Sequence, residues 1–284
     1  MNKRGQFTLF VVLGIVVLIL IGLFIVFQDD LLGFAGISQE LSYPSEVQEV
    51  VDHVQECVDA SSIEAVTQIG YSGGYYVVPD RSFDSSSLGV VVPYFYDDGE
   101  DLTISSDTLE EELSSYVSAL VDACVQVEQF SDLQIDLGDI STESLIEGDS
   151  VIVTVEYPFT VTAGESVYTI TNPYEAEVVA GLGALRDVAE SIVAYDVENP
   201  TAVDYTFLLG QGLTHITVAP VSQNTYFYVL QDAGVAGGIQ NLTFIFAEYY
   251  SDLAQYGECY EDADCDEGLA CLEGVCSAQE EEEA

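Results

Sequence analysis

The N-terminal segment MNKRGQFTLFVVLGIVVLILIGLFIVFQDD constrains the rest of this chain more than any other stretch. No charged side chain interrupts it from Phe7 to Phe27. As a helix rising about 1.5 Å per residue, it is long enough to cross a hydrocarbon core of about 30 Å. Lys3 and Arg4 precede it and two aspartates follow it. The positive-inside rule therefore places the N-terminus in the cytosol and the remaining residues outside the cell.

The residues before the apolar run carry a recognisable pattern. Lys3-Arg4-Gly5-Gln6, followed at once by Phe7-Thr8-Leu9-Phe10, resembles the class III signal of archaeal type IV pilin-like proteins. In that family a peptidase cuts after the glycine, which implies cleavage between Gly5 and Gln6. Residues 1–5 would then be a leader, and residues 6–28 a helix that stays in the membrane or enters a filament core. Bacterial pilins carry glutamate at the fifth mature position, whereas here that position is Phe10.

Two other interpretations of the segment stay open. If the leader is not cut, the chain is a membrane-anchored extracellular binding protein. An ordinary secretory signal has an apolar region of about 7–15 residues and a small-residue cleavage site. Gly33-Phe34-Ala35 offers such a site, although the apolar run is longer than usual.

The charge balance excludes several classes of partner. The chain has 50 Asp and Glu against 4 Lys and Arg, a net charge of −46. Nucleic acids and anionic lipid surfaces are excluded, because phosphate binding needs clustered bases. Disordered acidic chains are poor in apolar residues, whereas this one is 49% hydrophobic with 18 Tyr and 13 Phe, so it should fold. Acids spread along the whole chain indicate adaptation to molar salt, where the Debye length falls to about 3 Å.

Six cysteines predict three disulfides, because an extracellular compartment is oxidising. They are Cys57, Cys124, Cys259, Cys265, Cys271 and Cys276. The last four would form a separate module over residues 256–277, which leaves Cys57 and Cys124 to pair with each other. Both of these fall on apolar faces of expected helices, so their bridge would join the two helices.

Residues 45–255 predict an α+β ectodomain, which follows a linker over residues 29–44. Helices are expected from Ser45 onward, over 109–124, and from Val178 to an end near Asn199-Pro200, because apolar residues recur there at helical spacing. Strands are expected at 88–96, 150–157, 166–170, 214–219, 225–231 and 242–247, with a hairpin at 70–80 and a meander turn at 163–165. A break near 130–138 would divide the ectodomain into two subdomains.

The C-terminal stretch GECYEDADCDEGLACLEGVC is too short for a hydrophobic core, so disulfides must hold it. Its Cys-x-x-Gly-x-Cys spacing resembles small extracellular cysteine knots such as the Dickkopf-type module. Four cysteines permit three pairings, and our working hypothesis is Cys259–Cys271 with Cys265–Cys276. An acidic tail follows over residues 278–284.

The same module holds the one candidate metal site. Asp262, Asp264, Asp266 and Glu273 occupy positions 1, 3, 5 and 12 of an EF-hand calcium loop. Glu267 replaces the glycine of position 6, and chance matches are common in so acidic a chain. We therefore expect no cofactor, with calcium at these four residues as the alternative. Paired Cys-x-x-Cys spacing is missing, so a zinc site is not expected.

No catalytic constellation stands out along the sequence. His53 and His215 are the only histidines, no nucleophile elbow is present, and tryptophan platforms for sugars are lacking. A secreted hydrolase is the less favoured alternative. Asn241-Leu242-Thr243 is an N-glycosylation sequon.

Tyrosine-rich stretches are the main candidates for a binding surface. One comprises Tyr71, Tyr75 and Tyr76, and the other is Tyr94-Phe95-Tyr96. Tyrosine is favoured at interfaces, but it also packs strands against helices. The sequence thus predicts a non-enzymatic archaeal cell-surface protein, either a pilin-like filament subunit or an adhesive protein. Its expected partners are the membrane, copies of itself in a filament, and another cell surface.

Overall fold

The computed structural model describes residues 43–85, 90–200, 203–212, 215–222, 224–232, 234, 237–251, 269–272 and 275–278. The predicted leader, membrane segment and nearly all of the linker lie outside these residues. In the part that is described, no helix is both long enough and apolar enough to cross a membrane. The described elements confirm the predicted α+β class.

Two long helices carry the predicted disulfide. Helix α2 spans Ser45–Tyr71 and helix α3 spans Ser106–Cys124, and each buries an apolar stripe. Cys57 and Cys124 are joined, with their Cα atoms 5.7 Å apart, which confirms the predicted pairing. The bridge spans a sequence separation of 67 residues. Closing a loop of this size lowers the conformational entropy of the unfolded chain, which stabilises the folded state by about 4 kcal/mol.

The main sheet combines strands from both ends of the domain. Its order is β1-β2-β12-β11-β10, with β3 paired to β2. Strands β2 and β12 run parallel, and the other pairs are antiparallel. The bounds are β1 Ser82–Ser85, β2 Val90–Asp97, β3 Glu100–Asp101, β10 His215–Pro220, β11 Thr225–Gln231 and β12 Thr243–Tyr249.

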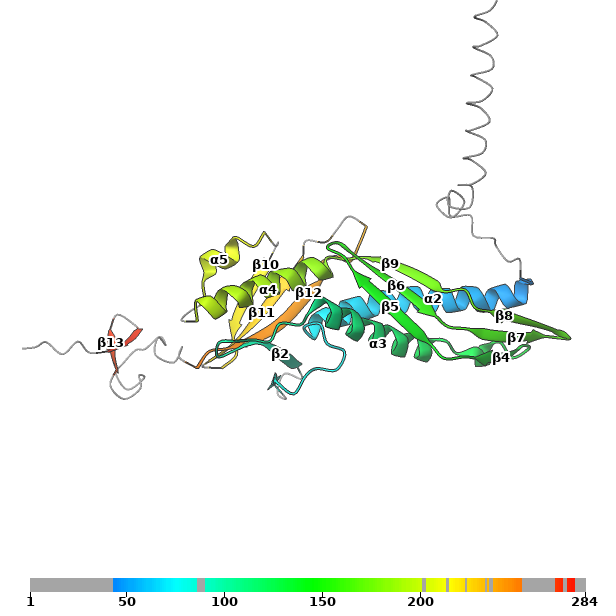
Figure 1. The fold of residues 1–284 in the computed structure, drawn as a ribbon, viewed down its shortest axis with the longest axis horizontal. Helices are drawn as coiled ribbons and strands as arrows, with labels where there is room; N and C mark the ends of the chain where they lie inside the picture. The colour runs from blue at the N-terminus through cyan, green and yellow to red at the C-terminus, as the bar shows by residue number, and fades with distance from the viewer. Residues whose placement is uncertain are drawn as a thin grey trace, which may run out of the picture. The chain divides into compact units, whose positions relative to one another are not determined.

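Two three-stranded antiparallel sheets are built from the middle of the chain (Figure 1). Their orders are β4-β7-β8 and β5-β6-β9. The bounds are β4 Gln134–Leu137, β5 Ser141–Ile146, β6 Ser150–Glu156, β7 Phe159–Ala163, β8 Ser166–Ile170 and β9 Tyr174–Val179. Strand β5 lies along α3, where Ser118 Oγ donates a hydrogen bond to Thr142 Oγ1.

Helix α2 meets both the β5-β6-β9 sheet and the main sheet. In its first half, Gln55 Nε2 donates to the carbonyl oxygen of Glu175 on β9, at 2.9 Å. Near its end, a Cβ added to Gly70 would lie 2.3 Å from the carbonyl oxygen of Thr243 on β12. Only glycine permits this close approach of helix to strand.

Two shorter helices, a 3-10 turn and a hairpin are the remaining described elements. Helix α4, Leu182–Glu198, packs on β12, β2, β3 and β11 (Figure 1). The short helix α5 spans Tyr205–Leu209, and a 3-10 turn spans Val127–Gln129. A hairpin pairs β13, Leu269–Leu272, with β14, Val275–Ala278.

Three local predictions are wrong. Residues 70–80 do not form a hairpin, because α2 continues to Tyr71 and a turn and bends follow it. Val178 belongs to β9 and not to the following helix. The turn at 163–165 is present, but the strand before it is β7 and not the strand expected at 150–157, which is β6 of the other sheet.

Candidate functional site

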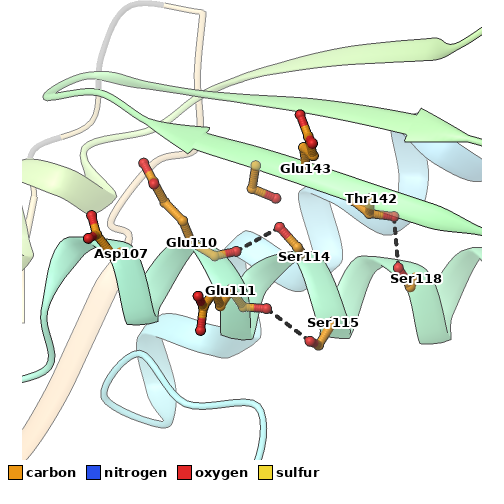
Figure 2. Close-up of a pocket in the computed structure, with 9 residues that line it drawn as sticks. Asp107, Glu110, Glu111, Ser114, Ser115, Ser118, Thr142 and Glu143 are labelled. Atoms are coloured by element: carbon orange, nitrogen blue, oxygen red, sulfur yellow. Dashed lines mark hydrogen bonds between the residues drawn. The ribbon is translucent and has the colours of Figure 1, made fainter.

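Two hollows flank helix α3. The larger, of about 750 Å³, lies between α3 and β5 (Figure 2). Acidic and hydroxyl side chains line it: Asp107, Glu110, Glu111, Ser114, Ser115, Ser118, Thr142, Glu143 and Ser144. We call it the acidic groove.

Several polar side chains of the acidic groove are hydrogen-bonded within the protein, whereas the buried Oγ of Ser144 has no hydrogen-bond partner among the described residues. Ser114 donates to the carbonyl oxygen of Glu110 at 2.7 Å, and Ser115 to that of Glu111 at 2.9 Å (Figure 2). Glu110 Oε1 accepts from the amide of Ile146 at 2.9 Å. No histidine lines this groove, and the described residues contain no group of three or more side chains that would hold a metal ion. The acidic groove is thus a hollow lined by carboxylates and hydroxyl groups.

The second hollow, of about 310 Å³, has an aromatic lining. It is formed by Gln68, Tyr71, Ser72, Tyr75, Tyr76, Val91 and Tyr116, and we call it the tyrosine groove. Tyr71 is 46% exposed and Tyr76 is 43% exposed. Tyrosines that keep this much surface in contact with water are available to a partner.

The turn that follows α2 brings these tyrosines together. The amide of Gly74 donates to the carbonyl oxygen of Ile69 at 2.7 Å, which satisfies the helix end. Gly73 has φ of +61°, and a Cβ there would lie 2.5 Å from Pro93 Cγ and 2.7 Å from the carbonyl oxygen of Ile245. Glycine is therefore required where the turn presses against the main sheet.

Glu112 of α3 fixes the segment after the turn. Its Oε2 accepts from the amide of Tyr76 at 2.8 Å and from the amide of Val77 at 3.2 Å. Four residues along α3, Tyr116 stacks on Tyr76 with ring centroids 4.7 Å apart and planes inclined by 14°. Residues four apart share one face of a helix, so a single face of α3 both holds the segment and supplies the stacking ring.

The hydroxyl groups of Tyr75 and Tyr116 are held in the protonated form. Burial raises the pKa of Tyr75, and the charge of Glu112 raises it further. Burial also raises the pKa of Tyr116, with smaller contributions from Glu64 and Tyr76. At neutral pH these hydroxyls can therefore donate hydrogen bonds.

A second set of tyrosines lies in the core beside two carboxyl groups, and we call Tyr228, Tyr250, Asp196 and Glu248 the buried tyrosine cluster. Tyr250 Oη lies 3.1 Å from Asp196 Oδ2 and 3.2 Å from Tyr228 Oη, and it also contacts Glu248 Oε2. A hydroxyl carries one proton, so Tyr250 donates to one carboxyl group and accepts from the other. The contacts are satisfied together when Tyr250 donates to ionised Asp196 and accepts from protonated Glu248.

Burial accounts for these protonation states. Asp196 is 3% exposed and Glu248 is 0% exposed. Desolvation raises the pKa of Asp196 to about 6. Desolvation, followed by the charge of Asp196, raises the pKa of Glu248 well above its usual range. Glu248 has no solvent-exposed surface, so the cluster is closed to solvent at this carboxyl group.

Sequence reasoning missed this cluster, although its pattern contains the signal. Asp196 continues the buried stripe of α4, which includes Leu185, Ala189 and Ile192. Glu248 follows Phe244 in the alternation of buried residues along β12. A carboxyl group that continues an apolar period indicates a buried acid.

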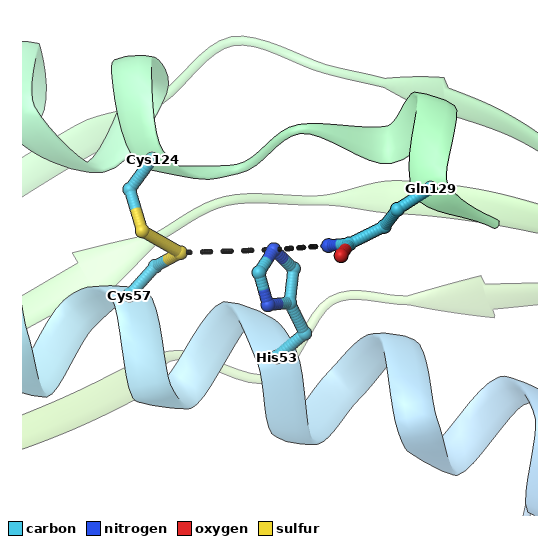
Figure 3. The surroundings of a disulfide bond; sticks show 4 residues. All are labelled: His53, Cys57, Cys124 and Gln129. Atoms are coloured by element: carbon cyan, nitrogen blue, oxygen red, sulfur yellow. Dashed lines mark hydrogen bonds between the residues drawn. A yellow bond between two sulfur atoms is a disulfide. The ribbon is translucent and has the colours of Figure 1, made fainter.

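The two histidines do not form a catalytic pair with a nucleophile. His53 lies beside the disulfide, where its Nε2 accepts from Gln129 Nε2 at 2.8 Å and lies 3.8 Å from Cys57 Sγ (Figure 3). Phe130 contacts the imidazole edge-on at 5.6 Å. His215 is exposed on β10. These contacts are those of a packed histidine next to a structural bridge.

The two tyrosine-rich stretches lie in different environments. Phe95 and Tyr96 are buried in the core, so packing explains them, and Tyr94 is half-buried. Tyr71 and Tyr76 reach the surface as described above.

The other predicted site residues are placed as follows. Asn241 is exposed in a bend just before β12, while Thr243 of the same sequon is buried. The hairpin of β13 and β14 places Cys271 and Cys276 at paired positions. The calcium candidates and the leader residues Gly5 and Gln6 lie outside the described residues, as do Cys259 and Cys265.

No family model matches this sequence, and no curated protein or solved structure is significantly similar to it.

Proposed function

We propose that this chain is a non-enzymatic cell-surface protein that contacts a partner through the tyrosine groove. The observation that carries the proposal is the Tyr76–Tyr116 stack, which Glu112 holds in place at the surface. A contact site prepared before binding loses little conformational entropy when the partner arrives. Tyrosine suits such a site, because it combines a large apolar face with a hydroxyl group.

The surface location follows from the apolar N-terminal segment and from its resemblance to class III signals. An oxidising compartment fits the Cys57–Cys124 disulfide. In this proposal the source is a halophilic archaeon, and the segment of residues 6–28 keeps the domain at the cell surface. The groove then faces other cells or secreted proteins.

The proposal is tested on cells that carry the full chain in place of their own copy. Tyr76→Ala combined with Tyr116→Ala removes the stack, and Tyr205→Ala removes an exposed tyrosine of α5 as the matched control. We expect the double variant to reach the surface at the normal level but to lose attachment to cells and solid supports. Equal attachment of the double variant and the control would overturn the proposal.

A pilin-like filament subunit is the second candidate, favoured by the pattern Lys3-Arg4-Gly5-Gln6 ahead of the apolar segment. The intact mass and N-terminal peptide of protein from its own membranes distinguish the two. A chain beginning at Gln6, together with filaments in negative-stain images of sheared surfaces, would support the filament. A chain that retains Lys3 and Arg4 would support a tethered contact protein.

A further inference from the structure

We infer that the tyrosine groove holds a positively charged side chain, a guanidinium or ammonium group, presented by a different protein. The inference rests on the proposed function, because it names the chemistry of the partner for the same groove. Three properties of the described residues lead to it: the aromatic faces, the neighbouring carboxylates, and the state of the chain's own arginines.

The aromatic faces suit a cation. The face of a tyrosine ring carries negative charge density and attracts a cation within about 6 Å of its centroid. Tyr76 remains 43% exposed while it stacks on Tyr116, and Tyr71 beside it is 46% exposed. Because Glu112 anchors the amide of Tyr76, the ring faces are positioned before a ligand arrives.

The charges around the groove select the sign of the ligand. Glu112 lies close enough to Tyr75, and Glu64 close enough to Tyr116, for each carboxylate to act on the neighbouring hydroxyl. None of the residues that line the groove is basic. Carboxylates beside ring faces favour a cation and repel phosphates or carboxylates.

Both arginines in the described part of the chain are already paired with carboxylates of the chain itself. Arg81 pairs with Glu100 at 2.8 Å and with Asp97. Arg186 pairs with Glu190 at 2.7 Å and with Asp187, and its Nε donates to the carbonyl oxygen of Ile104.

The other two basic residues, Lys3 and Arg4, precede the apolar segment. A second copy, which also carries a net charge of −46, is therefore a poor source of the cation. The partner should be a different protein with an exposed arginine or lysine.

The test uses the full chain in detergent micelles with ring-labelled tyrosine. The probes are a capped Gly-Gly-Arg-Gly-Gly peptide and the matched Gly-Gly-Gln-Gly-Gly peptide. We expect the arginine peptide to shift the Tyr76 and Tyr116 ring resonances, and the glutamine peptide to leave them in place. Tyr76→Ala should weaken arginine-peptide binding about two- to fivefold, the range of one exposed cation–π contact. Glu64→Gln should weaken it as well without touching the anchored segment, whereas Tyr205→Ala should have no effect.

The outcomes separate this inference from the proposed function. If both peptides bind equally, or if neither shifts the rings, the cation is not the ligand and the inference fails. The proposed function then still stands if the double variant loses cell attachment. If the arginine peptide binds while attachment is unchanged in the double variant, the groove recognises cations but the proposed function fails.

Discussion

The molecule contains two sets of tyrosines, the buried tyrosine cluster and the tyrosine groove, and each lies beside carboxyl groups. The first set is closed to water, whereas the second lies at the surface. In the buried tyrosine cluster, Glu248 has no contact with water and its pKa rises well above the usual range. In the tyrosine groove, Glu112 accepts two backbone amides and Tyr76 keeps almost half of its surface exposed. The same residue types therefore close the core in one place and, in the other, form the surface that we propose as a binding site. Burial, rather than composition, decides which role a tyrosine takes.

The largest expected effect comes from removing salt. It tests whether the folded structures of the buried tyrosine cluster and of the tyrosine groove both require that repulsion between carboxylates be screened. On transfer from molar salt to dilute buffer, the Debye length rises from about 3 Å to 10 Å or more. The ionised carboxylates then repel one another, and we expect the described domain to unfold completely. Tyrosine near-ultraviolet circular dichroism and ring resonances measure the transition. Both sets should lose their signals together. Persistence of the buried signals after loss of the groove signals would show that the two regions are stabilised separately.

The second effect separates hydrogen bonding from ring packing. Tyr250→Phe removes the hydroxyl between Asp196 and Glu248, so two buried carboxyl groups lose their shared partner. We expect a loss of about 3–4 kcal/mol in the free energy of unfolding, measured by denaturant titration in molar salt. Tyr76→Phe, which keeps the stacked ring of the groove, is the control and should cost less than about 0.5 kcal/mol. Equal effects of the two substitutions would contradict the distinction.

The third effect is the contribution of the buried tyrosine cluster to the dependence of stability on pH. The folded pKa of Asp196 is about 6, against an ordinary value of 3.8, and that of Glu248 is also raised. A raised folded pKa contributes stability that is fully present below the unfolded pKa and is lost as pH rises through the folded value.

The control for this dependence is Asp196→Asn combined with Glu248→Gln, which keeps the shapes but cannot titrate. From pH 4 to pH 8 the wild type should lose about 2–3 kcal/mol more than this variant. The other carboxyl groups titrate in both proteins, so they cancel in the difference. Parallel stability curves would mean that the pair is not buried as the structure has it.

The smallest effect concerns the anchor of the tyrosine groove. Glu112→Ala removes the acceptor for the amides of Tyr76 and Val77 and should cost about 1 kcal/mol. Nuclear Overhauser contacts between the Tyr76 and Tyr116 rings should weaken, because the segment is no longer held to α3. The matched control is Glu111→Ala, one residue earlier in the acidic groove. If the ring contacts survive in Glu112→Ala, the stack forms without the anchor.

Much of the fold could be predicted from local periodicity. The stripes of α2 and α3 placed Cys57 and Cys124 on facing helices, and β11 was predicted with the bounds that it has. The pattern was ambiguous at Val178, which fits both the alternation of β9 and the first turn of a helical stripe. In the folded protein, pairing within the sheet places Val178 in the strand. A single sequence does not show which strands pair.

The tyrosine groove could be predicted only in part. The sequence shows that residues 70–80 are rich in glycine and tyrosine, but the hairpin predicted there was wrong. Glu112 and Tyr116 come from a helix more than thirty residues further along the chain, and their contacts fix the segment after the turn. Local propensity does not contain such contacts. For the same reason the sequence could not show that Tyr96 is buried while Tyr76 is exposed.

The parallel pairing of β2 with β12 sets an order for folding. It joins the first half of the domain to β12, the last strand before the C-terminal hairpin among the described residues. Such distant contacts form late, because closing a long loop costs entropy. A chain that emerges N-terminus first therefore presents one edge of β2 without its partner until synthesis is nearly complete. Unpaired edges of this kind promote aggregation, because a second chain can pair with them. Pairing of β12 with β2 thus removes the edge with which a second chain could pair.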